Sequence, residues 1–210
     1  MATRFPFVPA DAAAVVGLGL LLMGRSAWRH ASIRLPAAPA AGAIKPRASP
    51  PFDSANRVVG FHLAVSLAAS GRTGEAMDLY RDIVRLDPAN AEARINLGLL
   101  LQGQGRDREA AFHFQEAIRA RPDYGPAYYN LGNLLSKQGR AADAALRYEE
   151  ALRIDPAMTD ARFNLANVRA RQQRWAEAAE GYRLVLKAEP GNQAARDYLR
   201  SVSVSAGQSR

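Results

Sequence analysis

Two consecutive stretches of equal length decide the fold: AEARINLGLLLQGQGRDREAAFHFQEAIRARPDY at residues 91–124 and GPAYYNLGNLLSKQGRAADAALRYEEALRIDPAM at residues 125–158. The stretches 57–90 and 159–192 have the same length and follow the same pattern. Proline recurs at position 32 of every stretch, as Pro88, Pro122, Pro156 and Pro190. A fixed period of this length is the signature of a repeat protein, in which each unit buries its apolar face against the next.

Four further columns of the repeat predict how each unit packs. Position 7 is always Leu, position 8 is always Ala or Gly, and position 20 is always Ala. Position 24 is always aromatic: Tyr80, Phe114, Tyr148 and Tyr182. Small side chains let two helices approach closely, and the aromatic side chain then fills the space between units. Each unit is therefore predicted to be a helix–turn–helix whose second helix stops before the proline.

The turn inside each unit has its own signal. Gly71, Gly105 and Gly139 follow the first helix of the first three units, where glycine accepts the left-handed conformation of a helix C-terminus. The fourth unit has Gln173 at this place, which predicts a strained or differently closed turn.

This pattern resembles the tetratricopeptide repeat, and the resemblance covers residues 57–192. It implies an all-α fold, a right-handed α-solenoid of four helix-turn-helix units within residues 55–192. Residues 193–210 are predicted to form a capping helix and a disordered tail, because the last unit of a solenoid otherwise exposes its apolar face.

In this family the first helices line a concave groove that holds peptides. Carried over by position, the resemblance assigns thirteen residues to the groove: Phe61, His62, Ile95, Asn96, Leu99, Tyr129, Asn130, Asn133, Lys137, Phe163, Asn164, Asn167 and Arg171. The row of amides is similar to the asparagine ladder of O-linked N-acetylglucosamine transferases. A primary amide both donates and accepts hydrogen bonds, so it can pair with the backbone of an extended peptide whatever the peptide's side chains. The aromatic residues would supply apolar anchors.

The N-terminal region, residues 1–34, contains an uncharged and mostly apolar run from Ala12 to Gly24. As a helix these thirteen residues would rise about 20 Å, less than the roughly 30 Å of bilayer hydrocarbon. The run fits a short membrane anchor, the apolar core of a cleaved signal peptide, or part of an organellar targeting segment or tail. An anchor would hold the repeats in the cytoplasm, since Arg25, Arg29 and Arg34 oppose translocation. A signal peptide would predict export or a periplasmic location.

Residues 35–54 join this region to the repeats and hold five of the twelve prolines. Proline is excluded from helix interiors and central strands, and alanine accompanies it here. The segment is therefore predicted to be a flexible linker.

Composition excludes several kinds of chemistry. There is no Cys, and His30, His62 and His113 lack metal-ligand spacing, so no metal site, cofactor or catalytic residue is predicted. The net charge of +8 suggests nucleic-acid binding at first. However, residues 55–192 hold nineteen basic and seventeen acidic residues, so the repeats are nearly neutral and no nucleic-acid partner is predicted.

The sequence thus predicts a non-catalytic scaffold that binds an extended peptide or a helix of a partner protein, tethered to a membrane and without a small-molecule substrate. The alternative is the substrate-recruiting arm of a glycosyltransferase. Only eighteen residues follow the repeats, too few for a catalytic domain in this chain.

Overall fold

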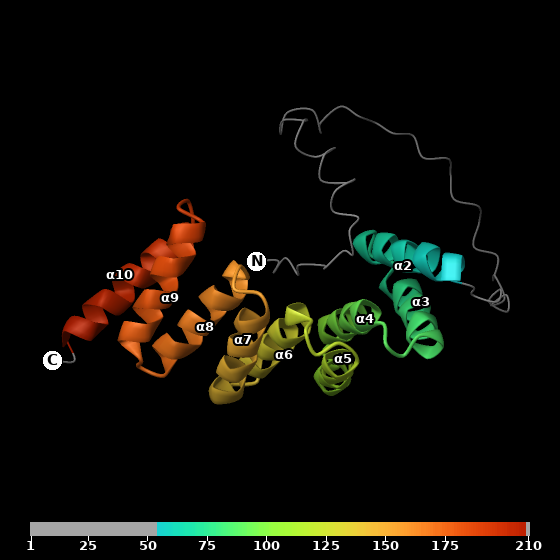
Figure 1. The fold of residues 1–210 in the computed structure, drawn as a ribbon, viewed down its shortest axis with the longest axis horizontal. Coiled ribbons are helices and arrows are strands. Elements are labelled where there is room, and N and C mark those ends of the chain that lie inside the picture. Colours follow the sequence, from blue (N-terminus) through green and yellow to red (C-terminus); the bar gives the residue numbers. More distant parts are fainter. Residues whose placement is uncertain (1–53, 209–210) are drawn as a thin grey trace, which may run out of the picture.

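The computed structural model describes residues 54–208, which form nine helices and no strand (Figure 1). In chain order these are α2 (Ser54–Ala69), α3 (Thr73–Leu86), α4 (Ala91–Gly103), α5 (Asp107–Ala120), α6 (Gly125–Lys137), α7 (Ala141–Ile154), α8 (Thr159–Arg171), α9 (Trp175–Ala188) and α10 (Gln193–Gln208). Each helix packs mainly against its neighbours in the chain, so the helices form a row of hairpins. The predicted all-α solenoid is confirmed.

The predicted N-terminal hydrophobic segment, residues 1–34, lies outside the described residues, as does nearly all of the predicted linker. Both stay predictions. Among the helices of residues 54–208, none combines the length and the apolar character that a membrane span requires.

All four turns inside the units close in the same way. Gly71, Gly105 and Gly139 have φ values of 81°, 75° and 76°, and Gln173 has φ 61°. The next residue then donates its backbone N–H to the carbonyl five residues back, for example Arg140 to Leu135 and Arg174 to Arg169, at 3.0 and 2.9 Å. This is the Schellman arrangement of a helix C-terminus. The predicted alternative closure at Gln173 is therefore wrong, whereas the predicted strain is present because a side chain occupies a left-handed position.

The aromatic residue at position 24 packs directly on the small residue at position 8. A Cβ atom built on Gly132 would lie 2.8 Å from Cε1 of Tyr148, and one on Gly98 would lie 2.6 Å from Cε1 of Phe114. Real Cβ atoms do not approach carbon so closely, so any side chain at these glycines would push the rings away. The rings themselves are fully buried between the helices.

A hydrogen bond links successive units in a way that the sequence analysis missed. The residue at position 4 of one unit donates to the backbone carbonyl of the proline that ends the previous unit. Arg94 Nε bonds Pro88 O at 2.8 Å, and Tyr128 Oη bonds Pro122 O at 3.1 Å. Arg162 makes the same contact with Pro156, and Arg196 Nη2 makes it with Pro190 at 2.6 Å. Because Arg196 lies on α10, the capping helix docks in the register of a fifth first helix.

The two ends of the solenoid differ in how their apolar residues are covered. Leu63, at position 7 of the first unit, is 49% exposed, whereas Leu97 at the same position of the second unit is 1% exposed. Within the described residues no earlier unit covers Leu63. At the other end α10 packs on α9 and buries its own Ala195 and Val202.

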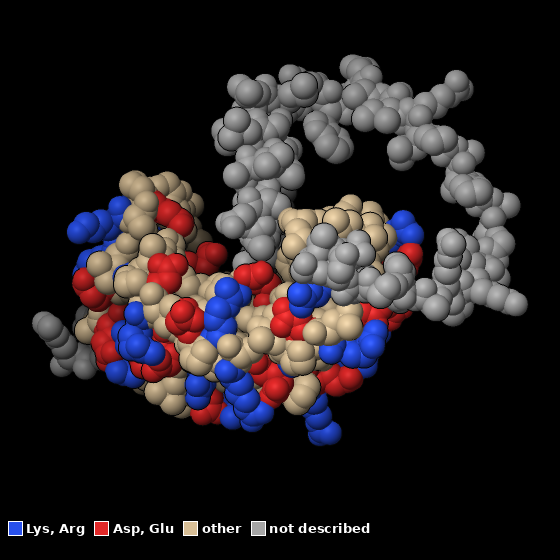
Figure 2. Space-filling view, turned by 45° about the vertical axis from the view of Figure 1, so that its right-hand side comes forward, with Lys and Arg blue, Asp and Glu red and all other residues tan. Residues whose placement is uncertain are grey.

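Charges of both signs are interspersed over the repeats on the face shown in Figure 2. Part of the reason is a recurring pair at the start of each second helix, where the arginine at position 16 binds the acid at position 19. The four pairs are Arg72 with Glu75, Arg106 with Glu109, Arg140 with Asp143, and Arg174 with Glu177. Each of these exposed pairs contributes little to the free energy of unfolding, but together they neutralise four arginines on the surface.

We predict that Gln173→Gly stabilises the protein by about 1 kcal/mol, because glycine removes the side chain from the left-handed position. Chemical denaturation followed by circular dichroism measures the change. The control is Gln104→Gly, at a helix end with φ −91°, where glycine should cost about 0.5–1 kcal/mol. Equal changes in the free energy of unfolding for the two substitutions would show that the backbone at Gln173 is not strained.

We predict that Val202→Asp weakens the docking of α10, because the aspartate would be buried against α9 at a cost of about 3 kcal/mol. The matched control is Val204→Asp, two residues away and 58% exposed, which should change little. Thermal denaturation should show a loss of roughly 6–12 °C for the first variant. Hydrogen exchange should show faster exchange in α9 and α10, and equal behaviour of both variants would mean that α10 is no cap.

Candidate functional site

The predicted groove residues divide into an enclosed group and an open group. The enclosed group lies mainly in the first two units and is at most 7% exposed: Phe61, Ile95, Asn96, Leu99 and Asn130. The open group lies mainly in the last two units and is half-buried or exposed: His62, Tyr129, Asn133, Lys137, Phe163, Asn164, Asn167 and Arg171. The accessible part of the predicted site is therefore centred on α6 and α8.

A network of hydrogen bonds joins the open amides to the buried aromatic residues. Tyr148 Oη donates to Asn133 Oδ1 at 2.7 Å, and Asn164 Nδ2 donates to the same oxygen at 2.9 Å. In the next unit Tyr182 Oη donates to Asn167 Oδ1 at 2.6 Å. Three amides on α6 and α8 are thus oriented by phenols from α7 and α9 and by one another.

These bonds fix which groups of the amides remain available. The Nδ2 group of Asn167 and the Oδ1 atom of Asn164 have no hydrogen-bond partner among the described residues, and they are not enclosed. The amide of Asn133 also interacts with the phenol of Tyr129. One donor and one acceptor therefore remain free. An extended peptide backbone presents both carbonyl acceptors and N–H donors, so the groups are complementary.

The phenols keep their protons under physiological conditions. Burial raises the pKa of Tyr182 to about 12 and raises the pKa of Tyr148 well above its ordinary value. Burial also raises the pKa of Tyr129, although the amides of Asn133 and Asn164 oppose this shift. Each phenol stays a neutral donor, so the orientation of the amides should not change with pH near neutrality.

Position 6 of the second and third units behaves differently from the open amides. Asn130 Nδ2 donates to the backbone carbonyl of Pro126 at 2.8 Å, in the preceding turn of its own helix. Asn96 is fully buried, and neither polar atom of its side chain makes a direct hydrogen bond within the described residues. The hydroxyl of Tyr80 is also buried and makes no direct hydrogen bond, but it lies near the Asn96 amide, which opposes the rise that burial causes in the pKa of Tyr80. Position 9 of this unit is Val65, where the third and fourth units have asparagine.

The cations assigned to the groove have different surroundings. Lys137 Nζ lies 3.2 Å from both carboxylate oxygens of Asp107 and is neutralised. Arg171 is exposed and has no ion-pair partner among residues 54–208. Its charge acts on the phenols of Tyr148 and Tyr182, so it lies at the open group and can meet a negative charge there.

The capping helix places an aromatic residue beside the predicted groove residues. Tyr198 lies one full repeat period after Asn164, so it continues the position 6 column beyond the fourth unit, and the sequence analysis did not include it. Its ring stacks on Tyr182 with centroids 5.7 Å apart and meets the edge of Phe163 at the same distance. Phe163 is thus partly covered by the cap, and Tyr198 is 50% exposed beside it.

No cluster of three or more metal-ligating residues occurs within residues 54–208. The open group consists of amides, one phenol, one phenyl ring, one imidazole and two cations. This combination can bind a polypeptide through backbone hydrogen bonds and apolar contact.

Comparisons with solved structures show the same fold in several proteins. The crystal structure of MamA protein superimposes with a TM-score of 0.65 at 19% identity, over 72% of this chain and 82% of that chain. YrrB, described as a TPR protein with an unusual peptide-binding site, gives 0.62 at 22% identity, over 72% and 78%. The first TPR of Spaghetti (RPAP3), bound to the HSP90 peptide SRMEEVD, gives 0.54 at 24% identity, over 56% and 93%.

A search of curated protein sequences finds no significant match. Two family models, both described as tetratricopeptide repeat, match residues 67–135 and residues 129–200. Together they cover well over half of the 210 residues, and the chain therefore belongs to the tetratricopeptide-repeat family.

Proposed function

We propose that this protein is an interaction scaffold that binds an extended segment of a partner protein in the groove of α6 and α8. The observation that carries the proposal is the hydrogen-bonded set of amides on Asn133, Asn164 and Asn167, which leaves Nδ2 of Asn167 and Oδ1 of Asn164 oriented and free. Polar groups fixed in advance lose little entropy on binding, so they favour association. The half-buried rings of Tyr129 and Phe163 lie beside them as apolar anchors.

The chemistry of the groove defines the segment that would fit. Amides recognise backbone and so require an extended chain rather than a particular side chain at each place. Arg171 has no acid of its own, so an acidic residue in the partner would find a free charge at the end of α8. The peptide-bound structure of RPAP3 and the peptide-binding site named for YrrB support a peptide ligand for this fold.

The partner can be captured with a photoreactive residue placed in the groove of the full chain in its host. p-Benzoylphenylalanine at position 129 or 163 should form a covalent adduct with one partner, whose crosslinked segment mass spectrometry then identifies. The control is the same residue at position 86, because Leu86 is 40% exposed at the end of α3, away from the groove.

The second unit supplies a design for removing the polar network without disturbing the packing. There the residues equivalent to Asn133 and Tyr148 are Leu99 and Phe114, and both are buried and well packed. The double substitutions Asn133→Leu with Tyr148→Phe, and Asn167→Leu with Tyr182→Phe, copy this apolar pair into the third and fourth units. Neither leaves a buried hydroxyl without a partner, so the fold should persist.

We predict that the combination of both pairs weakens binding of the crosslinked partner segment by about 1–3 kcal/mol, roughly 5- to 150-fold in Kd. Fluorescence anisotropy with the labelled segment measures the change, and circular dichroism checks the helix content. The control Tyr80→Phe removes a buried phenol hydroxyl that is not part of the network on α6 and α8, and it should leave Kd unchanged. An unaltered affinity in the four-residue variant would show that the amides do not bind the partner.

A further inference from the structure

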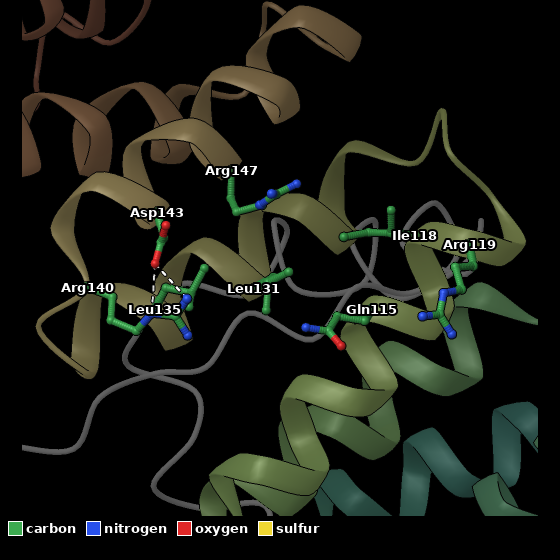
Figure 3. A pocket seen from close by; sticks show the side chains of 8 residues that line it. All are labelled: Gln115, Ile118, Arg119, Leu131, Leu135, Arg140, Asp143 and Arg147. Carbon is green, nitrogen blue, oxygen red and sulfur yellow. Dashed lines mark hydrogen bonds and ion pairs between the residues drawn. The ribbon is translucent and has the colours of Figure 1, made fainter.

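A cavity of about 420 Å³ lies between the second and third units, where α5 meets α6 and α7 (Figure 3). Leu131 and Leu135 of α6 line it. These residues are two positions beyond the groove residues Tyr129 and Asn133, about 200° further around the helix. The cavity therefore opens on a different side of α6 from the groove, and its size is within the range of ligand-binding pockets.

The cavity has an apolar floor. Leu131 and Leu135 are 5% and 7% exposed, and Ile118 from α5 lies half-buried beside them. An aliphatic side chain placed on this floor would cover the exposed part of Ile118 and the small areas of Leu131 and Leu135 that still face water.

The rim carries three arginines, of which two are neutralised by the chain itself. Arg140 Nη2 lies 2.6 Å from Asp143 Oδ2, and Arg119 pairs with Glu116. Arg147 is half-buried and has no ion-pair or hydrogen-bond partner among the described residues. Figure 3 shows its guanidinium extending from α7 toward Ile118 and away from Asp143. One free positive charge thus lies next to the apolar floor.

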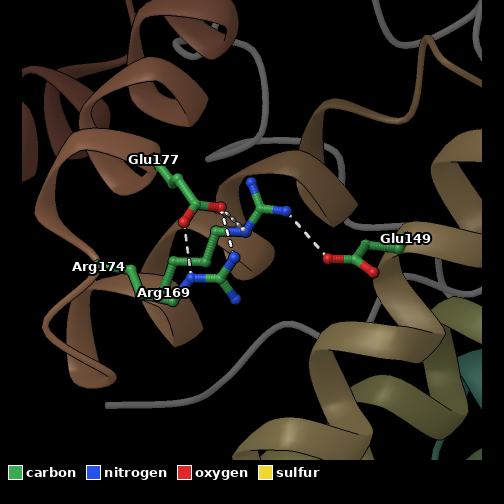
Figure 4. A network of polar contacts seen from close by, with 4 residues as sticks. All are labelled: Glu149, Arg169, Arg174 and Glu177. Carbon is green, nitrogen blue, oxygen red and sulfur yellow. Dashed lines mark hydrogen bonds and ion pairs between the residues drawn. The ribbon is translucent and has the colours of Figure 1, made fainter.

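The equivalent junction of the third and fourth units shows how this chain satisfies such an arginine when it does so internally. A shift by one repeat period replaces Gln115, Leu135 and Arg147 by Glu149, Arg169 and Gly181. This junction keeps a smaller cavity, of about 230 Å³, and Arg169 lines it. Arg169 Nη2 lies 2.9 Å from Glu149 Oε1, and its Nε lies 3.5 Å from Glu177 Oε2 (Figure 4). The arginine of that junction has two carboxylates, whereas Arg147 has none.

We propose that the cavity at Arg147 is a second binding site, for a short segment of a partner protein that presents one carboxylate next to an aliphatic side chain. The carboxylate would pair with the guanidinium, which has the planar geometry for a two-point contact. The aliphatic side chain would lie on Leu131, Leu135 and Ile118. A polyanion such as nucleic acid fits poorly, because it requires several free cations and the neighbouring arginines are already paired.

Nuclear magnetic resonance titration of the full chain with a minimal probe tests this site. The probe is the capped dipeptide acetyl-Leu-Glu-amide, and acetyl-Leu-Gln-amide and sodium acetate are its matched controls. We expect the probe to shift the Nε–Hε signal of Arg147 and the methyl signals of Leu131 and Leu135 in a saturable way. The glutamine analogue should bind about fivefold more weakly, and acetate should leave the methyl signals in place.

Two variants distinguish this cavity from other sites. Gln115→Glu with Leu135→Arg copies the ion pair of the next junction into the cavity, and should abolish the shifts while helix content is retained. If that variant does not fold, Arg147→Leu serves the same purpose, because it removes the guanidinium and keeps an aliphatic side chain. Arg153→Ala is the control, since Arg153 lies on the same helix and already pairs with Glu150.

Three results would overturn the proposal: equal binding of the glutamine analogue, methyl shifts with acetate alone, or shifts confined to the groove residues. Saturable binding that persists in the variants that fill the cavity or remove the Arg147 charge would overturn it as well.

Discussion

The packing of one aromatic ring on one small residue in each unit is the constraint on which the rest of the structure depends. Tyr148 lies so close to Gly132 that a single Cβ atom would not fit. This contact fixes the rotation of the two helices about each other, and the left-handed turn that follows the first helix fixes their spacing. Because the period does not change, successive units repeat the same helix packing at each junction.

The same contact connects stability with the groove. The rings at position 24 are buried for packing, yet the hydroxyls of Tyr148 and Tyr182 reach through to the amides of the first helices. A phenol therefore stabilises the unit with its ring and orients a binding group with its oxygen. In the second unit Phe114 and Leu99 retain only the packing role, and the groove there is closed and apolar.

The sequence predicted the helices and their order, because these depend on the period. The groove columns came from the family resemblance and stay a prediction. It could not predict which asparagines are open, because exposure depends on the side chains of neighbouring units: Asn96 and Asn164 share a column, but only Asn164 is accessible. The hydrogen bonds from Arg94 and Tyr128 to proline carbonyls could not be predicted either, because two different residue types make the same contact and position 4 therefore shows no pattern. Tyr198 could have been found by extending the column by one more period.

Position 11 of the repeat shows how variation inside a fixed backbone creates differences in function. Leu135 and Arg169 occupy the same place in consecutive units, and both junctions keep the same helix packing. With arginine at this place the junction keeps a cavity of about 230 Å³, and Arg169 contacts both Glu149 and Glu177. With leucine the cavity is about 420 Å³, and Arg147 beside it has no carboxylate among the described residues. A guanidinium that its neighbours leave unpaired beside apolar side chains is complementary to a carboxylate next to an aliphatic group, which is the ligand proposed for the cavity at Arg147.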